Sequence, residues 1–310
     1  MTMSTAPESP APFEAGQPCS TWARELGLDP IGTAGCYRGY LLVEWALPWP
    51  RDLGEDEVLA PVVESARSHG MRFQALVPTS ESGPRHVVAY RWPASGGARF
   101  WRTELAVEPG ELAAACLAVL DVPAAESGGT DVLVCTHGRR DRCCGSLGTA
   151  LAQELLGDAR PLGQDVRVWR TSHTGGHRFA PTAVVLPQGT AWAFCDAATL
   201  ARIVRGDGLM DDLLPRYRGC AGLVSPAVQA LERAVLAVVG WPLFEMARQG
   251  SELGDDRTEL VVEDPTAGRV VWEAVVRVAG TIQLPGCGLA REAATKPEPQ
   301  LVVEGLRLRR

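Results

Sequence analysis

The 310-residue sequence predicts an α/β protein made of two similar units, followed by a C-terminal helix and hairpin. Two observations carry this prediction. Short apolar runs typical of strands alternate with segments whose apolar residues recur at helical spacing. The order strand, helix, strand, hairpin, helix also occurs twice between residues 40 and 206. The chain is longer than one ordinary domain, so it has room for both units and an extension.

In the first unit the apolar pattern begins at residue 41. The helix expected over 58–66 contains Pro61, so it can begin only near Ala60, and Gly70 ends it. Pro109 and Gly110 precede the second helix. The expected strands cover residues 41–43, 73–77, 86–92 and 99–103, and the expected helices cover 58–66 and 111–120.

The second unit repeats this order, and its last helix ends at Gly206. Its expected strands cover 131–135, 166–170, 183–186 and 191–194, and its helices cover 149–156 and 197–204. In the extension, Ser225 and Pro226 are a helix cap and a first-turn proline, and that helix runs to Gly240. A hairpin over 259–263 and 270–278 and a last strand over 301–308 follow.

These boundaries divide the chain into four segments. Residues 1–18 are rich in Pro, Ala, Ser and Glu, and we expect a disordered leader there. Residues 19–125 form the first unit, 128–210 the second, and 221–310 a C-terminal α+β extension.

Composition excludes several classes of protein. A net charge of −7 argues against a surface that follows nucleic-acid phosphates. No apolar run is long enough for a membrane span, and Arg24 and Glu25 interrupt the region where a signal peptide would be apolar. Nine cysteines without an export signal predict reduced thiols in a cytoplasmic protein. The oligomeric state is left open.

Two short loops of the second unit concentrate atoms that bind metals. The first runs from Cys135, at the end of an expected strand, to Cys143 and Cys144, and it is rich in Gly and Arg. The second contains His173 and His177 around a Gly-Gly pair, which favours a tight loop over a helix. Three of the five histidines of the chain fall in these loops, so they are the candidate metal site.

Two thiolates and two imidazoles suit either tetrahedral zinc or a [2Fe–2S] cluster with mixed ligands. Zinc sites usually pair cysteines two to four residues apart, whereas eight residues separate Cys135 from Cys144. This spacing favours the larger, two-iron group, and the residues alone leave both alternatives open.

The order of elements resembles the thioredoxin fold in both units. The sequences Cys-Thr-His-Gly, Arg-Asp and Cys-Cys-Gly, followed by His-Thr-Gly-Gly-His-Arg-Phe-Ala, resemble the sucrase/ferredoxin-like family. That resemblance implies that the second unit is a thioredoxin-like ferredoxin. It also implies a [2Fe–2S] cluster held by Cys135, Cys144, His173 and His177. Cys144 is preferred to Cys143 because family members have a cysteine followed by Gly at this position.

The remaining residues of the two loops are assigned smaller roles. Cys143 and His137 are the next candidates for ligands. We expect a second layer around the ligands to contain Arg139, Arg140, Asp141 and Arg178. The other six cysteines are interpreted as small buried residues: Cys19, Cys36, Cys116, Cys195, Cys220 and Cys287.

The sequence thus predicts an iron–sulfur protein that acts in electron transfer or redox sensing, and we expect a carrier rather than a catalyst. Its redox partner protein is unknown. Two alternatives remain. One is a thioredoxin-like thiol–disulfide oxidoreductase that uses Cys143 and Cys144, and the other is a zinc-stabilised scaffold that binds partners.

Overall fold

The computed structural model describes residues 18–126, 128–284 and 296–309. Its α-helices are α1 (Cys19–Glu25), α2 (Ala60–Ser68), α3 (Leu112–Val119), α4 (Thr149–Gly157), α5 (Ala197–Arg205) and α6 (Pro226–Val239). The strands of a large mixed sheet are β1 (Gly39–Glu44), β2 (Met71–Leu76), β3 (Arg85–Arg91), β4 (Trp101–Val107), β5 (Thr130–Cys135), β6 (Val166–Thr171), β7 (Ala183–Leu186), β8 (Thr190–Trp192) and β9 (Tyr217–Cys220). A smaller antiparallel sheet contains β10 (Ala247–Gly254), β11 (Arg257–Asp264), β12 (Gly268–Leu284) and β13 (Lys296–Arg309).

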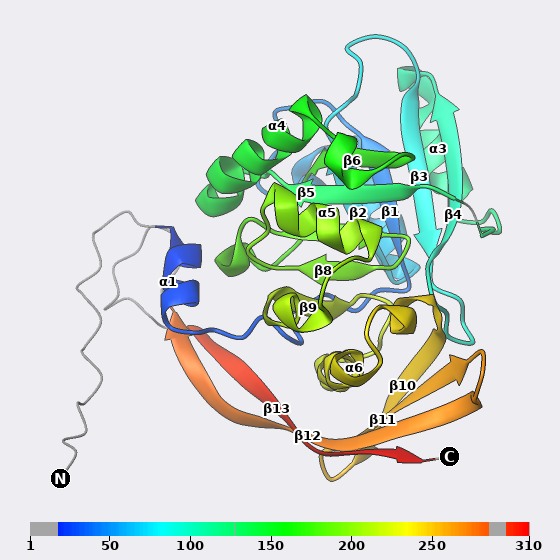
Figure 1. The fold of residues 1–310 in the computed structure, drawn as a ribbon. Helices are drawn as coiled ribbons and strands as arrows, with labels where there is room; N and C mark the ends of the chain where they lie inside the picture. The colour runs from blue at the N-terminus through cyan, green and yellow to red at the C-terminus, as the bar shows by residue number, and fades with distance from the viewer. Residues whose placement is uncertain (1–17, 127, 285–295, 310) are drawn as a thin grey trace.

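The large sheet has the order β4-β3-β1-β2-β6-β5-β7-β8-β9, and its two halves share one topology (Figure 1). In the first half β1 and β2 are parallel, β3 is antiparallel to β1, and β4 is antiparallel to β3. In the second half β5, β6, β7 and β8 repeat these relations. A helix follows the first strand of each half, and another follows the fourth. The predicted α/β class and the repeated order of elements are therefore confirmed.

The two halves meet at a narrow junction between β2 and β6. Only Leu76 and Thr171 pair there in antiparallel register, and the Ser172 N–H donates to the Ala75 carbonyl 2.8 Å away. Side chains from both halves also pack into one buried cluster, to which β1 contributes Leu42 and β5 contributes Leu133. The two predicted units thus share one continuous sheet and the buried cluster on one of its faces.

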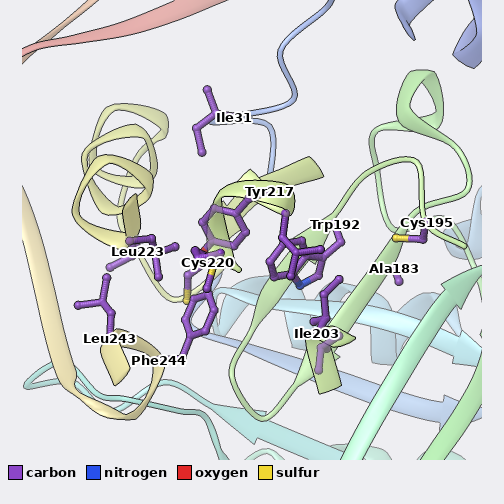
Figure 2. Packing of buried hydrophobic residues seen from close by; sticks show 14 of the residues in the cluster. Ile31, Ala183, Trp192, Cys195, Ile203, Tyr217, Cys220, Leu223, Leu243 and Phe244 are labelled. Carbon is purple, nitrogen blue, oxygen red and sulfur yellow. The ribbon is translucent and has the colours of Figure 1, made fainter. Parts of the chain in front are cut away.

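Helices cover the other face of each half. Because side chains alternate along a strand, Leu41 and Val43 face away from Leu42 and pack with α2 and α3. In the second half the corresponding cluster includes α4, α5, α6 and the small sheet. Figure 2 shows Trp192 and Tyr217 near the centre of this cluster, where their rings lie 4.9 Å apart.

The C-terminal extension continues this core and returns to the start of the chain. Ser225 caps α6 as predicted, since its Oγ accepts from the Val228 N–H at 3.3 Å. Helix α6 lies between β9 and the small sheet, and one end of the long β12–β13 hairpin reaches α1 (Figure 1). The Asp29 N–H donates to Gln300 Oε1 at 2.9 Å, which links this hairpin to the segment after α1.

The structure corrects several expectations. Strand β4 begins at Trp101 rather than at Arg99, because the Phe100 N–H donates to the Pro187 carbonyl instead of to a sheet partner. Helix α1 and strands β9 and β10 were not predicted, since each is short or rich in polar residues. Within the three described ranges, no helix combines the length and apolar character needed to cross a membrane. The expected leader lies outside these ranges except for Pro18.

Candidate metal centre

The ends of two neighbouring parallel strands bring the predicted loops together. Cys135 is the last residue of β5 and lies in register with Thr171, the last residue of β6. The cysteine loop follows the first strand and the histidine loop follows the second, so both leave the same edge of the sheet. The carboxyl ends of parallel strands commonly carry sites in α/β proteins.

The two predicted sulfur ligands are fully buried and in contact. The Cys144 thiol donates a hydrogen bond to the sulfur of Cys135, and both side chains are 0% exposed. Cys144 opens a π-helical turn, Cys144–Gly148, that leads into α4. A Cβ at Gly148 would lie 1.9 Å from the Cys135 carbonyl oxygen, so only glycine permits this approach. The glycine therefore brings Cys144 next to the end of β5.

One buried carboxylate holds both histidines. Asp141 Oδ2 lies 2.8 Å from His173 Nδ1, and Asp141 Oδ1 lies 3.1 Å from His177 Nδ1. The Asp141 side chain is 10% exposed. Carboxylates commonly engage one nitrogen of a ligating imidazole, which fixes the tautomer and orients the ring. With Nδ1 directed to Asp141, Nε2 is the nitrogen of each ring that a metal would take.

Distant segments fix the backbone of the histidine loop. Arg72 Nη2 and Gln74 Nε2, both on β2, donate to the His173 carbonyl at 2.7 and 3.1 Å. Arg218 on β9 donates to the Gly175 carbonyl at 3.3 Å. Gly176 has a φ of 71°, and a Cβ there would lie 2.4 Å from the Arg218 guanidinium. The loop is thus positioned by the first half of the large sheet and by its far edge.

Hydrogen bonds among the candidate ligands shift their pKa values. The hydrogen bond from Cys144 lowers the pKa of Cys135 well below its usual range; burial opposes this shift, and contact with His173 reinforces it. The same bond raises the pKa of Cys144. Burial alone would lower the pKa of His173, but hydrogen bonds to Asp141 and Cys135 outweigh it and raise that pKa. These shifts favour negative charge on Cys135 over Cys144 and favour positive charge on His173.

Cys135 is hydrogen-bonded both to Cys144 and to His173, so three of the four predicted ligands are linked through it. His177 joins them through Asp141. Among the residues that the structure describes, no three His, Cys, Asp or Glu side chains are arranged to hold a single metal ion. The four predicted ligands therefore lie close together, but their side chains do not surround a position for a single metal ion.

The next candidates for ligands lie at the edges of this site. His137 is 4% exposed, its Nε2–H donates to the Pro50 carbonyl at 2.9 Å, and its ring meets that of Trp49 edge to face. Burial lowers its pKa. His137 therefore ties the loop after β1 to the loop after β5. Cys143 contacts a cysteine that was interpreted as a simple core residue, since its Sγ lies 3.3 Å from Cys19 Sγ.

Of the four residues expected in a second layer around the ligands, some contact the site or its loops and others do not. Asp141 contacts both histidines, and Arg178 is buried and pairs with Glu298 of β13. Arg140 reaches the Arg51 carbonyl at 3.3 Å instead, and Arg139 is exposed. Cys19, Cys116, Cys195 and Cys220 are buried as predicted, whereas Cys36 is exposed and Cys287 lies outside the described residues.

Two clefts adjoin the exposed side of the site. One, of about 430 Å³, is lined by His137 and His173 together with four arginines, Arg51, Arg67, Arg72 and Arg140. The other, of about 450 Å³, is lined by His173, His177 and Asp141. The histidine side chains are 16% and 24% exposed, whereas the two sulfurs are buried. The site thus opens to the surface only on its imidazole side.

Comparison with known proteins identifies the family of the chain. A family model described as sucrase/ferredoxin-like matches residues 30–219, more than half of the chain. The chain belongs to the sucrase/ferredoxin-like family. The match to this family contains both ligand loops and ends at β9, so it leaves out α1, α6 and the small sheet. Neither the curated proteins nor the solved structures give a match to the chain.

Sequence reasoning missed the residues that reach the site from elsewhere in the fold. They are Cys19, Arg72, Gln74, Arg218 and Glu298. Each lies far along the chain from the loop that it contacts, and none belongs to a local pattern that could have indicated its role.

Proposed function

We propose that this chain binds one [2Fe–2S] cluster through Cys135, Cys144, His173 and His177 and acts in electron transfer or redox sensing. The single observation that carries the proposal is Asp141, whose two oxygens engage the Nδ1 atoms of both histidines. A carboxylate in this position is typical of imidazoles that ligate through their other nitrogen. Membership in a family whose name includes ferredoxins agrees with this assignment.

The donor set fits such a cluster in kind. Two sulfurs and two imidazoles match a cluster in which histidines replace two of the cysteines. A [2Fe–2S] cluster at this position would carry one electron at a time.

We also infer that each half of the large sheet is thioredoxin-like. The order β4-β3-β1-β2, with one parallel and two antiparallel pairs, supports this inference, and so does its repetition in β8-β7-β5-β6. Under this interpretation, only the second half carries ligands, and the corresponding loop of the first half contributes Pro50 as an acceptor for His137.

The residues of the site have separate roles in this proposal. Cys135 and Cys144 lie on the buried side, where the protein excludes water from the sulfurs. His173 and His177 lie toward the two clefts, so electrons would enter or leave through the imidazoles. The Asp141 carboxylate lies beside Nδ1 of each ring, at 2.8 and 3.1 Å, and stabilises positive charge on both imidazoles. The arginines of the first cleft favour a partner with an acidic surface.

Anaerobic purification followed by metal and sulfide analysis tests the proposal. We expect iron and acid-labile sulfide in equal amounts, visible absorption, and an electron paramagnetic resonance signal after reduction. Replacing Cys135 or His173 with serine or alanine should abolish these signals, whereas Cys116→Ser, in a core remote from the loops, should leave them unchanged. Colourless protein with stoichiometric zinc would instead identify a zinc-stabilised scaffold.

A thiol–disulfide oxidoreductase that uses Cys143 and Cys144 is the weaker alternative. Both side chains are buried, at 1% and 0% exposure, and a nucleophilic thiol needs access to its substrate. Thiol–disulfide turnover by metal-free protein would favour this alternative over the cluster.

A further inference from the structure

A second pair of sulfur atoms lies beside the candidate centre. Cys19 Sγ is 3.3 Å from Cys143 Sγ, although 124 residues separate them in the sequence. Their side chains are 2% and 1% exposed. Because a disulfide bond is about 2.05 Å long, these atoms need to approach by only roughly 1.2 Å to form one.

This contact joins α1 to the cysteine loop. Cys19 is the first residue of α1, and Cys143 directly precedes the predicted ligand Cys144. Helix α1 also packs on the histidine loop, since Trp22 shares a buried cluster with Phe179 and Cys19 Sγ lies 4.0 Å from the His177 carbonyl. A covalent bond between the two sulfurs would therefore fasten α1 to the place where both loops meet.

We infer that Cys19 and Cys143 form a reversible disulfide that locks α1 against the candidate centre. The oxidant is a low-molecular-weight disulfide. The two thiols together lose two protons and two electrons as the new S–S bond forms, and the oxidant's S–S bond breaks to give two thiols. Excess small thiol reverses the reaction. Cys135 and Cys144 take no part, so the inference does not require the cluster.

Burial makes this reaction depend on a local opening of the chain. Helix α1 has only seven residues and no side-chain hydrogen bond at its N-cap. So short a helix depends on its packing, and such elements open at a lower free-energy cost than the whole domain. We therefore expect the pair to oxidise more slowly than the exposed Cys36, and to respond to sustained rather than brief oxidation.

The experiment uses the full chain as purified, with Cys36→Ser introduced to remove the exposed thiol. The protein is equilibrated in glutathione buffers of increasing oxidised fraction, the remaining thiols are alkylated, and the masses of the chain and its tryptic fragments are measured. We expect the loss of two alkylatable thiols and a linked fragment that contains Cys19 and Cys143. Cys19→Ser and Cys143→Ser should each abolish it, whereas Cys116→Ser should not.

Cys144→Ser resolves which cysteine of the vicinal pair is bonded, because Cys143 and Cys144 share one tryptic fragment. This variant should retain the fragment linked to Cys19. Trypsin cleavage after Arg24, an exposed residue of α1, gives a second measure and should slow at least several-fold in the oxidised protein.

Oxidation that persists in Cys19→Ser, or a linked fragment that joins Cys135 to Cys144, would overturn the inference. Loss of iron in the ligand variants, by contrast, concerns the cluster alone. The two proposals can therefore fail separately.

Discussion

Asp141 is the residue on which the candidate centre depends most. Its carboxylate engages both histidines, yet it was assigned from the sequence only as one of four residues in a second layer. Its partners lie 32 and 36 positions further along the chain, beyond the reach of any local pattern. The contact exists because β5 and β6 end side by side.

Replacing this carboxylate should weaken the site without unfolding the chain. Asp141→Asn keeps the shape of the side chain but loses its charge, so the imidazoles become poorer ligands. We expect iron to pass to a chelator about tenfold faster than from the unaltered protein. Arg142→Gln, at an exposed position of the same loop, is the matched control and should release iron at the unaltered rate. Equal rates for both variants would remove Asp141 from its proposed role.

At the scale of elements, the approach of α4 to β5 depends on a single glycine. A Cβ at Gly148, directly before α4, would meet the Cys135 carbonyl at 1.9 Å, whereas one at Gly157, the last residue of α4, would meet nothing within 4 Å. We expect Gly148→Ala to lower the free energy of unfolding by about 2–3 kcal/mol through backbone displacement. Gly157→Ala should raise it by about 0.5 kcal/mol, since alanine favours helix. Urea denaturation of both variants and of the unaltered protein measures these changes in the free energy of unfolding, which we expect to have opposite signs.

A buried carboxylate at the start of β5 also connects the two halves of the large sheet. Asp131 is fully buried and accepts hydrogen bonds from Tyr90 on β3, and from Arg167 and Trp169 on β6. Burial alone would raise the pKa of Asp131, but the bonds and charge of Arg167 outweigh it and lower that pKa. The ionised carboxylate therefore stabilises the fold.

Asp131→Asn tests this connection. We expect a loss of about 2–4 kcal/mol at neutral pH, because Arg167 keeps Glu104 but loses one of its two carboxylate partners, and Tyr90 and Trp169 lose a charged acceptor. Since the pKa of Asp131 is lower in the folded chain, its contribution is present above the unfolded value of about 4 and is lost as the pH falls through the folded value. The variant should therefore lose less stability than the unaltered protein on acidification, as measured by urea denaturation at several pH values. Asp121→Asn, at a side chain that is 87% exposed, should change neither quantity.

At the scale of the whole molecule, the charge near the candidate centre differs in sign from the net charge. The chain carries −7 overall, yet four arginines line the cleft beside His173. Charges within a screening length of about 10 Å dominate at ordinary ionic strength, so the local arginines decide which partners approach.

Small redox mediators test this charge directly in the iron-loaded protein. Replacing Arg51 and Arg140 together with glutamine should slow electron exchange with anionic ferricyanide about threefold or more at low salt. Exchange with a cationic ruthenium ammine should stay equal or become faster. Arg277→Gln, on β12, is the control and should leave both rates unchanged. A fall in both rates for the double variant would show that the cleft does not select by charge.

The sequence predicted most elements of the fold, because their signals are local. Short apolar runs located β1, β5 and β7, and capping residues located both ends of α6. The elements that it missed, α1, β9 and β10, are short or polar, and contacts with the rest of the chain hold them in place. The sequence did not predict how the two units are joined, namely by pairing between Leu76 and Thr171 that makes one sheet of both.

By itself, the sequence determined which donor atoms the protein offers and on which loops they lie, because residue types and the ends of strands can be recognised from short stretches of sequence. Only the tertiary structure decided that Asp141 joins the two histidines, that Arg72 and Arg218 hold their loop, and that Cys19 meets Cys143. These contacts join segments that are distant in the chain. Packing of the two half-sheets, α1 and β9 brings them together, and no periodicity or spacing along the chain encodes that packing.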